Sequence, residues 1–496
     1  MATWAHSSPQ LTKLEAFKRH VNLKHNLALA DYEQLHKWSV NETELFYQEI
    51  WDFCGVVYSA PPSRAVSDSS RMWPRPEWYS GARLNFTENV LAVGLAAHPD
   101  KIAVSACREA GTQWKHLTWK QLEREIARYT SALRIAHVKA MDRVAGICHS
   151  GGGALLKHKM DMALAMDLGI DSIYYQYTSK NKEADYGADI SVTHWGTSPK
   201  FLGTLMRDLN GPLPSLAALQ TVLVSGSALS EELCDWFYTV FPKEVGLHNG
   251  SGGTDMLGGI IGGNNLIRIH GNELAAAALG MKVEIWDENG NNIDDSGQKG
   301  ELVITKPFPS MPVTFWGEGG DEKYRNAYFD TFPNVWCHGD FVSRDIKTKG
   351  YLVHGRSDGV LNPGGVRFGT AEIYNVVSRF AEVDDSIAVG QRRPQDQDEQ
   401  VLLFIKMRDG INFDEALELK IRDAIKTLLS PRHVPAYILH VRDIPYTMSG
   451  KKVEKAVKSV VIGERVQNAG AISNAECLKE YEKYISLLDI KWAAKL

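Results

Sequence analysis

The segment TVLVSGSALSEELCDWFYTV (residues 221–240) decides the fold class of this chain. Its apolar start, Thr221–Val224, predicts a buried strand that ends in the turn Ser225-Gly226-Ser227. The following residues, Glu231–Val240, have the apolar spacing of a helix. Strands such as Gly300–Thr305 alternate with helices on both sides of this segment. This order predicts an α/β protein with at least one mixed sheet.

On the N-terminal side, Leu11–Tyr58 has helical spacing, and Ile102–Cys107 with Gln113–Leu117 predicts a hairpin. Thr118 is a suitable N-cap for the helix that follows. We expect this helix to bury one apolar stripe. The stripe consists of Leu122, Ile126, Tyr129 and Leu133.

On the C-terminal side, Asp358–Lys458 has the pattern of a separate α+β unit. It contains an amphipathic helix at Phe413–Leu429 with Leu417, Ile421, Ile425 and Leu428 on one face. The sequence therefore predicts two domains. Residues 1–357 form a large domain of mixed sheets and helices, and residues 358–496 form a small α+β domain with a helical tail.

The composition excludes several classes of protein. The 496 residues carry a net charge of −5 and are 44% hydrophobic, which is typical of a globular protein rather than a disordered one. The near-neutral charge balance gives no electrostatic footprint for nucleic acid. No run of eighteen uncharged apolar residues is present, so we expect no membrane span.

The cysteines and the C-terminus bear on the compartment. The six cysteines form no CxxC pair and predict free thiols in a reducing compartment. We therefore expect a cytoplasmic protein. The C-terminal Ala494-Lys495-Leu496 differs from the peroxisomal address Ser-Lys-Leu at one position, so the peroxisome is the alternative.

Two glycine-containing segments have residues suited to a nucleotide. Asn249–Asp255 (NGSGGTD) can bring backbone amides close to an anion and offers a hydroxyl and a carboxylate. Its alternative is a tight loop between strands. In Val335–Asp340 (VWCHGD) the carboxylate could accept hydrogen bonds from two ribose hydroxyls. Its alternative is an ordinary turn aspartate.

Two further segments carry cations. Gly350–Arg367 places Arg356 and Arg367 on either side of a Gly/Pro-rich bend, and arginine suits phosphate or ribose oxygens. Pro445–Glu454 (PYTMSGKKVE) places Lys451 at a loop tip, where it could reach a phosphoryl group. The alternatives are a solvated hairpin and an ordinary turn lysine.

Together the four segments resemble the acyl-adenylate-forming superfamily of acyl-CoA synthetases, luciferases and peptide-synthetase adenylation domains. Within it, the chain is most similar to the acetoacetyl-CoA synthetase family. The stretches that carry this resemblance are WYSGARLNFTEN (78–89), THWGTSPKFL (193–202), GSGGTD (250–255), MPVTFWGE (311–318), YRNAYFDTFPNVWCHGD (324–340), NPGGVRFGTAEIYN (362–375) and IPYTMSGKKVE (444–454).

The resemblance implies a ligase that works in two half-steps on small-molecule substrates. Acetoacetate and ATP would give an acyl-adenylate and pyrophosphate, and the thiol of CoA would then displace AMP. It implies catalysis by Thr254 at the α-phosphate and by Lys451, and a Mg²⁺-side carboxylate at Asp255. The nucleotide-binding residues that it implies are Gly226, Ser227, Ser251, Gly252, Gly253, Asp340, Arg356 and Arg367.

The resemblance also implies a moving small domain. Asp358 matches the hinge, and Arg432 matches a partner for a CoA phosphate. The acyl-pocket neighbours implied are His194, Thr197 and Ser198.

One family signature is absent. Members carry a Ser/Thr/Gly-rich phosphate loop ending in lysine, of the type SSGTTGLPK, and no such loop occurs here. The motif spacings imply that about 170 residues are missing, near 146/147 and again near 178/182. We therefore expect impaired adenylation, with unpaired sheet edges and exposed apolar faces in the large domain. The alternatives are a non-catalytic nucleotide- or CoA-binding relative and a mis-spliced product.

Overall fold

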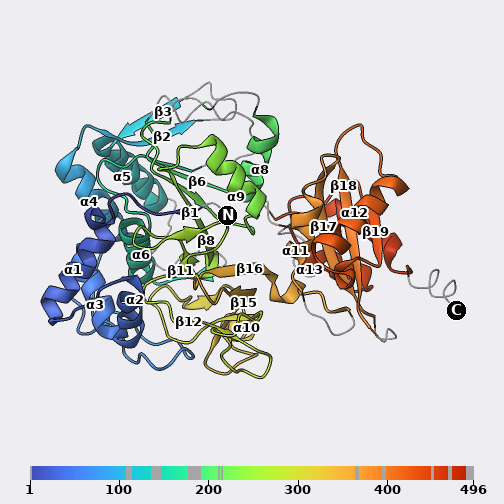
Figure 1. Ribbon diagram of the computed structural model, residues 1–496. Coiled ribbons are helices and arrows are strands. Elements are labelled where there is room, and N and C mark those ends of the chain that lie inside the picture. The colour runs from blue at the N-terminus through green and yellow to red at the C-terminus, as the bar shows by residue number, and fades with distance from the viewer. Residues whose placement is uncertain are drawn as a thin grey trace.

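A computed structural model describes residues 3–107, 114–135, 147–176, 191–209, 213, 216–363, 368–393, 398–447, 452–466 and 472–487. The fold is the expected mixed α/β type, with sheets flanked by helices (Figure 1). The elements from β1 to β16 form one body, which we call the large lobe (Figure 1). The elements from α11 onward form a second body, the small lobe, on the right of that view.

The central sheet of the large lobe has six strands in the order β11-β9-β8-β7-β6-β5. The strands β5 to β8 are parallel, whereas β8, β9 and β11 are antiparallel, so the sheet is mixed as predicted. The bounds are β5 (Tyr174–Gln176), β6 (His194–Thr197), β7 (Thr221–Val224), β8 (Gly246–Gly253), β9 (Gly258–Gly262) and β11 (Ala276–Ala277).

Two helices, α8 (Pro199–Asp208) and α9 (Glu231–Val240), pack on one face of the parallel strands. Each begins at a serine whose hydroxyl accepts a backbone N–H, Ser198 for α8 and Ser230 for α9. Their buried side chains and those of β7 and β8 form one apolar cluster that includes Phe237. The strand and helix predicted for residues 221–240 are both confirmed.

A second, antiparallel sheet leads toward the small lobe. Its order is β12 (Val283–Trp286), β13 (Gly300–Ile304), β15 (Trp336–Arg344) and β16 (Tyr351–Arg356). Three further pairs are two-stranded: β1 (Thr3–Trp4) with β10 (Ile269–His270), β2 (Ile102–Cys107) with β3 (Trp114–Thr118), and β4 (Ile147–Cys148) with β14 (Thr314–Phe315).

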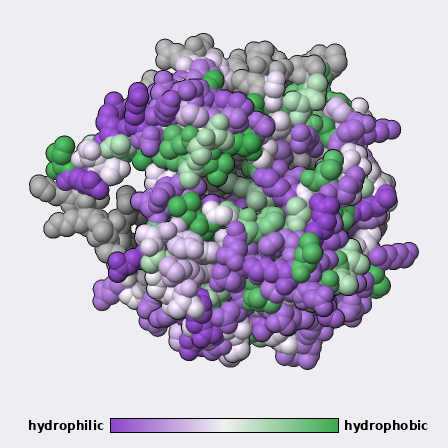
Figure 2. Space-filling model, turned by 90° about the vertical axis from the view of Figure 1, so that its left-hand side faces the viewer, coloured by the Kyte–Doolittle hydropathy of each residue, from purple (hydrophilic) through white to green (hydrophobic). Residues whose placement is uncertain are grey.

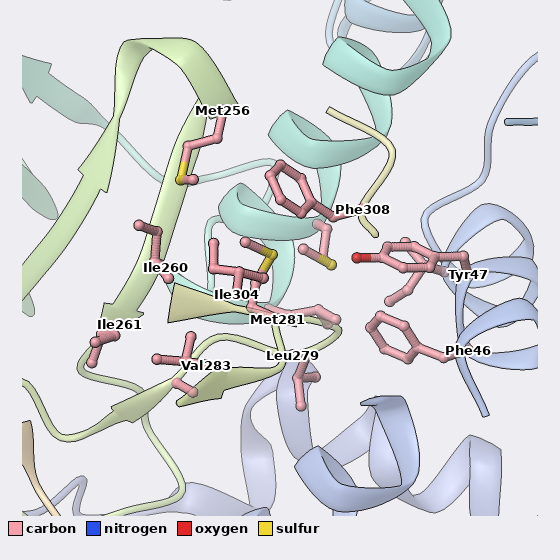
Figure 3. Packing of buried hydrophobic residues seen from close by; sticks show 14 of the residues in the cluster. Phe46, Tyr47, Met256, Ile260, Ile261, Leu279, Met281, Val283, Ile304 and Phe308 are labelled. Carbon is pink, nitrogen blue, oxygen red and sulfur yellow. The ribbon is translucent and has the colours of Figure 1, made fainter. Parts of the chain in front are cut away.

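The predicted N-terminal helical region forms α1 (Lys13–His25), α2 (Tyr32–Asn41) and α3 (Thr43–Phe53). Phe46 and Tyr47 of α3 are buried against Met281 and Phe308, which come from the region of the second sheet (Figure 3). The other helices of this lobe are α4 (Phe86–Ala97), α5 (Trp119–Ile135), α6 (Gly151–Met160) with its π-helical continuation η2 (Asp161–Ala165), and α10 (Gly320–Tyr328).

The helix α5 begins where predicted, because the backbone N–H of Gln121 donates to Thr118 Oγ1 at 3.2 Å. The expectation that its apolar stripe is buried is wrong. The side chains of Tyr129 and Leu133 are 61% and 53% exposed. Leu122 and Ile126 of the same stripe are only partly buried.

Several apolar side chains of α4 and β2 are exposed as well, including Val93 and Ile102. Figure 2 shows apolar residues gathered in the upper part of this side of the molecule. The exposure agrees with the expectation that a large piece of the family fold is absent here.

The small lobe contains a three-stranded sheet with helices. Its strands are β17 (Val383–Gln391), β18 (Gln400–Met407) and β19 (Tyr437–His440). Its α-helices are α11 (Thr370–Val377), α12 (Glu415–Leu428) and α13 (Glu454–Val461), and its 3-10 helices include η6 (Pro431–His433) and η8 (Ala475–Tyr484). On α12, Leu417, Ile421 and Ile425 are buried as predicted. Leu428 is exposed because it lies in the last turn.

A buried histidine on β8 is expected to make the stability of the large lobe depend on pH. Neither ring nitrogen of His248 has a hydrogen-bond partner among the described residues, and Trp4 packs edge-on against the ring at 5.1 Å. Burial, with His194 and His6 nearby, lowers the pKa of His248 to about 3. The folded state therefore binds this proton less readily than the unfolded chain. The stability it contributes is complete above about pH 6.5 and is lost as the pH falls toward 3.

We expect the free energy of unfolding of the large lobe to drop by about 2 kcal/mol between pH 7 and pH 5 through His248 alone. His248→Phe removes the titrating group, so this part of the pH dependence disappears. Urea unfolding at both pH values measures it, with His440→Phe at an exposed position as the control. An equally steep pH dependence in His248→Phe and the control would contradict the prediction.

Candidate active site

The carboxyl ends of three parallel strands bring the predicted segments together. Thr197, Val224 and Asn249 are aligned across β6, β7 and β8, so the residues after each strand emerge at one edge of the sheet. In open α/β sheets this edge is where ligands bind. Gly226, in the turn after β7, has φ +103°, a conformation that favours glycine. Ser227 follows it and is exposed.

The glycine segment is a strand followed by a short turn. Gly250–Gly253 pair with β9, and Thr254 begins the 3-10 turn η3 (Thr254–Met256). A Cβ on Gly252 would lie 2.1 Å from the carbonyl oxygen of Gly258, so only glycine allows this backbone approach. Thr254 is exposed at the end of the strand. This geometry is compatible with both interpretations of the segment: a tight connection between strands and a nucleotide-binding segment.

A cluster around Asp340 lies beside the glycine segment. Asp340 on β15 pairs with Arg356 on β16, and the Arg356 Nη1 donates to Asp340 Oδ1 at 3.1 Å. The Ser251 hydroxyl donates to Asp340 Oδ2 at 3.2 Å, and His338 Nε2 lies 3.6 Å from the same oxygen. The Asp340 side chain is 11% exposed, whereas that of Arg356 is 51% exposed. A mostly buried carboxylate beside a half-exposed cation suits a polar ligand with hydroxyl and phosphate groups.

The position of Arg356 depends on Gly339. This glycine has φ +82°, and a Cβ there would lie 2.4 Å from Arg356 Nη2. The backbone N–H of Gly339 also donates to Glu301 Oε1 at 2.7 Å, and burial raises the pKa of Glu301. Sequence reasoning missed Glu301 because its contact with Gly339 depends on the register between β13 and β15. It also missed His338, which lies two residues before Asp340 on β15. The Cys-His-Gly-Asp run was the available signal for His338.

Asp255 lies at the same edge and has an aromatic partner. The Tyr328 hydroxyl, at the end of α10, donates to the Asp255 carboxylate. The Tyr328 ring stacks on Trp336 at 3.7 Å, and burial together with Asp255 raises the pKa of Tyr328. No group of three or more metal-binding side chains occurs in the described part of the chain. Mg²⁺ needs only one or two protein carboxylates when substrate phosphates supply the rest, so Asp255 fits such a site.

The glycine stretch at the start of α6 does not replace the missing phosphate loop. Gly151–Gly153 form the first turn of α6, and the Ser150 hydroxyl caps it. The following cation, Lys157, is buried, and its Nζ donates to Asp161 Oδ1 and to the Gly259 carbonyl, both at 2.8 Å. Because this ammonium group is buried and paired within the core, it is not available to bind a phosphate.

The three residues expected near the acyl group lie in different places. His194 starts β6 and aligns with Thr221 and Gly246, at the opposite end of the sheet from the glycine segment. Thr197 ends β6, and its buried hydroxyl has no hydrogen-bond partner among the described residues. Ser198 caps α8. Of the three residues, Thr197 lies at the candidate edge and has a hydroxyl without a hydrogen-bond partner among the described residues. The structure does not bring His194 to this edge.

The remaining candidate residues are those predicted for the hinge and the small domain. Asp358 lies in the turn η4 (Ser357–Gly359), which follows Arg356 directly. Arg432 is exposed on η6. Arg367 and Lys451 lie outside the described residues, and so do residue 146 and residues 177–190, where the two joins were expected.

Comparison with known proteins identifies the family. Residues 155–311 match the AMP-binding enzyme family, and residues 32–90 match the acetyl-coenzyme A synthetase N-terminus. Acetoacetyl-CoA synthetase of Xenopus tropicalis is 30% identical over 654 aligned positions, covering 96% of each chain. The chain belongs to the acetoacetyl-CoA synthetase family. It is thus a member of the AMP-forming acid–thiol ligases, which consume ATP and CoA.

Two further proteins are similar to this chain over nearly its whole length. Acetoacetyl-CoA synthetase from Streptomyces lividans has the same fold, with a TM-score of 0.83, 23% identity and coverage of 97% of this chain and 98% of that chain. Malonamoyl-CoA synthetase vrtB of Penicillium aethiopicum is 28% identical over 675 positions, covering 97% of this chain and 92% of the relative.

The alignment also measures what this chain lacks. Of its 496 residues, 96% is about 476, whereas the alignment with the Xenopus tropicalis protein has 654 positions. About 180 positions of the relative therefore face no residue here. This shortfall is close to the one expected from the spacing of the motifs. In the described part of the chain, no helix is long and apolar enough to cross a membrane.

Proposed function

We propose that this chain is an acetoacetate–CoA ligase that retains the nucleoside side of its active site and has a slow adenylate-forming step. The overall reaction converts acetoacetate, ATP and CoA to acetoacetyl-CoA, AMP and pyrophosphate through an acyl-adenylate. The observation that carries the proposal is the cluster of Ser251, Asp340 and Arg356 beside the glycine segment.

The cluster suits the ribose and phosphate of AMP. Asp340 is buried and already accepts from Ser251 and Arg356, so its orientation is fixed before a ligand arrives. Two ribose hydroxyls can donate to such a carboxylate, and the half-exposed Arg356 can then turn to ribose or phosphate oxygens. Gly226 and Ser227 would lie along the adenine, and Thr254 near the α-phosphate.

The proposed identity of the acid substrate follows from the relatives, and the proposed Mg²⁺ site follows from one carboxylate. Acetoacetate is the acid named for the relatives that match nearly the whole chain, whereas the malonamoyl-CoA synthetase shows that a similar chain can serve another acid. Both acids are short and carry a second carbonyl group, for which the Thr197 hydroxyl is a suitable donor. Asp255 would hold Mg²⁺ together with the substrate phosphates.

Replacing Asp340 tests the nucleoside site without requiring turnover. We expect Asp340→Ala to weaken AMP binding by about 10- to 100-fold, since hydrogen bonds to a charged group contribute about 1.5–3 kcal/mol. Isothermal titration calorimetry with AMP measures the change. Asp345→Ala is the matched control, because Asp345 accepts from the backbone of the β15–β16 turn and has no contact with the cluster.

Equal AMP affinity in wild type and Asp340→Ala would contradict the assignment of the ribose site. Normal AMP binding with no detectable formation of thioester from acetoacetyl-adenylate would favour the non-catalytic binding relative. Circular dichroism of both variants verifies that the comparison is made between folded proteins.

A further inference from the structure

One lysine of the large lobe contacts the small lobe close to the candidate active site. Lys200 lies in the first turn of α8, directly after the carboxyl end of β6. Its Nζ is 3.5 Å from Asp385 Oδ2 on β17 and 4.1 Å from the centre of the Tyr446 ring. Both partners belong to the small lobe, so this ion pair and cation–π contact join the two lobes.

Asp385 also contacts the described residues that precede and follow Lys451 in the sequence. It accepts from the Tyr446 hydroxyl and from Lys452 Nζ, the latter at 2.7 Å. Lys452 Nζ further donates to the Ser386 carbonyl and lies 3.9 Å above the Tyr374 ring. Although burial alone would raise the pKa of Asp385, the two lysines and the Tyr446 hydroxyl lower it to about 2, so it is an anion at neutral pH. One carboxylate therefore binds residues on both sides of Ser449-Gly450-Lys451.

We propose that Lys200 is a positioning residue for the adenylate-forming step, holding Tyr446 and, through Asp385, Lys452, the described ends of the segment that contains Lys451, at the carboxyl edge of the central sheet. The inference rests on the proposed function, because the segment matters through Lys451. Lys200 touches neither nucleotide nor acid and acts through Asp385.

The location of the contact relative to the hinge supports a role in one conformation only. A second ion pair between the lobes, Lys299 Nζ to Glu372 Oε1 at 2.7 Å, is next to the hinge, because Glu372 lies in the first turn of α11. Rotation about η4 displaces groups far from the hinge more than groups near it. The Lys200–Asp385 pair is therefore the one that separates when the small lobe turns to present another face for the thioester step.

The test compares the two half-reactions in Lys200→Gln. We expect the rate of adenylate formation to fall about five- to tenfold, as for the loss of an ion pair and a cation–π contact. This rate is measured by the acetoacetate-dependent exchange of labelled pyrophosphate into ATP. Formation of acetoacetyl-CoA from supplied acetoacetyl-adenylate should change less than about twofold. Lys200→Arg should restore most of the exchange, since guanidinium keeps both contacts.

The matched control is Lys406→Gln. Lys406 lies on β18 of the small lobe and pairs with Asp384 and Asp443 of the same lobe, at 3.2 and 3.0 Å. It removes the same charge without touching the contact between lobes, so both half-reactions should stay at the wild-type rate. An equal loss in both half-reactions of Lys200→Gln, or no loss in either, overturns the proposal.

Hydrogen exchange separates this inference from the proposed function. Backbone amides of α8 and of residues 444–447 should exchange faster in Lys200→Gln than in wild type and Lys406→Gln, whether or not the chain turns over. If exchange rates rise but no adenylate forms in the wild type, the contact is real and the proposed function fails. If they do not rise, the positioning role of Lys200 fails.

Discussion

Adenylate formation by this chain is expected to be at least about 100-fold slower than in the full-length Xenopus tropicalis relative, while thioester formation from supplied adenylate stays within about tenfold. The first step places a carboxylate against the phosphates of ATP and needs donors for the β- and γ-phosphates. Each pre-organised donor that is lost costs about 10²–10³-fold. Here the loop that would supply them is absent, Gly151–Gly153 form a helical turn, and Lys157 is paired with Asp161.

The measurement compares pyrophosphate exchange with thioester formation in both proteins. A chimera carrying the relative's unmatched segment between Gly146 and Ile147 should regain most of the exchange rate. A control insert in which the loop's threonines and lysine are alanine should cover the same apolar surface of α5 without restoring exchange. Exchange at the relative's rate by the unmodified chain would show that the loop is not needed.

Lys451→Ala is expected to lower the remaining adenylate formation by about 100-fold or more, because its charge would stabilise the pentavalent transition state at the α-phosphorus. The thioester step should be nearly unchanged, since the small lobe then presents a different face. Pyrophosphate exchange and thioester formation are measured as before.

Lys455→Ala serves as the control for Lys451→Ala. Lys455 lies four residues after Lys451 and is exposed on α13, so its substitution removes the same charge. A loss of equal size in the two variants would indicate a general electrostatic effect rather than a specific role for Lys451. A fall of both half-reactions in Lys451→Ala would assign the lysine to both steps.

Local patterns predicted the elements well where each segment decides its own structure. Thr221–Val224 and Glu231–Val240 have the predicted bounds, since an apolar strand, a turn with glycine and a serine cap act within a few residues. The stripe of α5 was misjudged for a non-local reason. Periodicity shows that one face of a helix is apolar, but whether that face is buried depends on its neighbours, and here Tyr129 and Leu133 stay exposed.

The same distinction holds for the site. Asp340, Arg356 and the glycine segment could be proposed from the sequence because each belongs to a run of residues with specific chemistry, and the structure places them side by side. Glu301, Tyr328 and the Lys200–Asp385 contact were not, because they depend on strand register and on the packing of the two lobes. The sequence could not show that His194, three residues before Thr197, lies at the opposite end of a short strand; its place near the acyl group stays a prediction.

A crystal structure with a non-hydrolysable acetoacetyl-adenylate analogue tests the central claim most directly, namely that the cluster at Asp340 holds the nucleoside of an adenylated acid. We expect both ribose hydroxyls within hydrogen-bonding distance of Asp340, with adenine beside Gly226 and the acyl group toward Thr197. An analogue bound elsewhere, with no ribose hydroxyl near Asp340, would contradict the account.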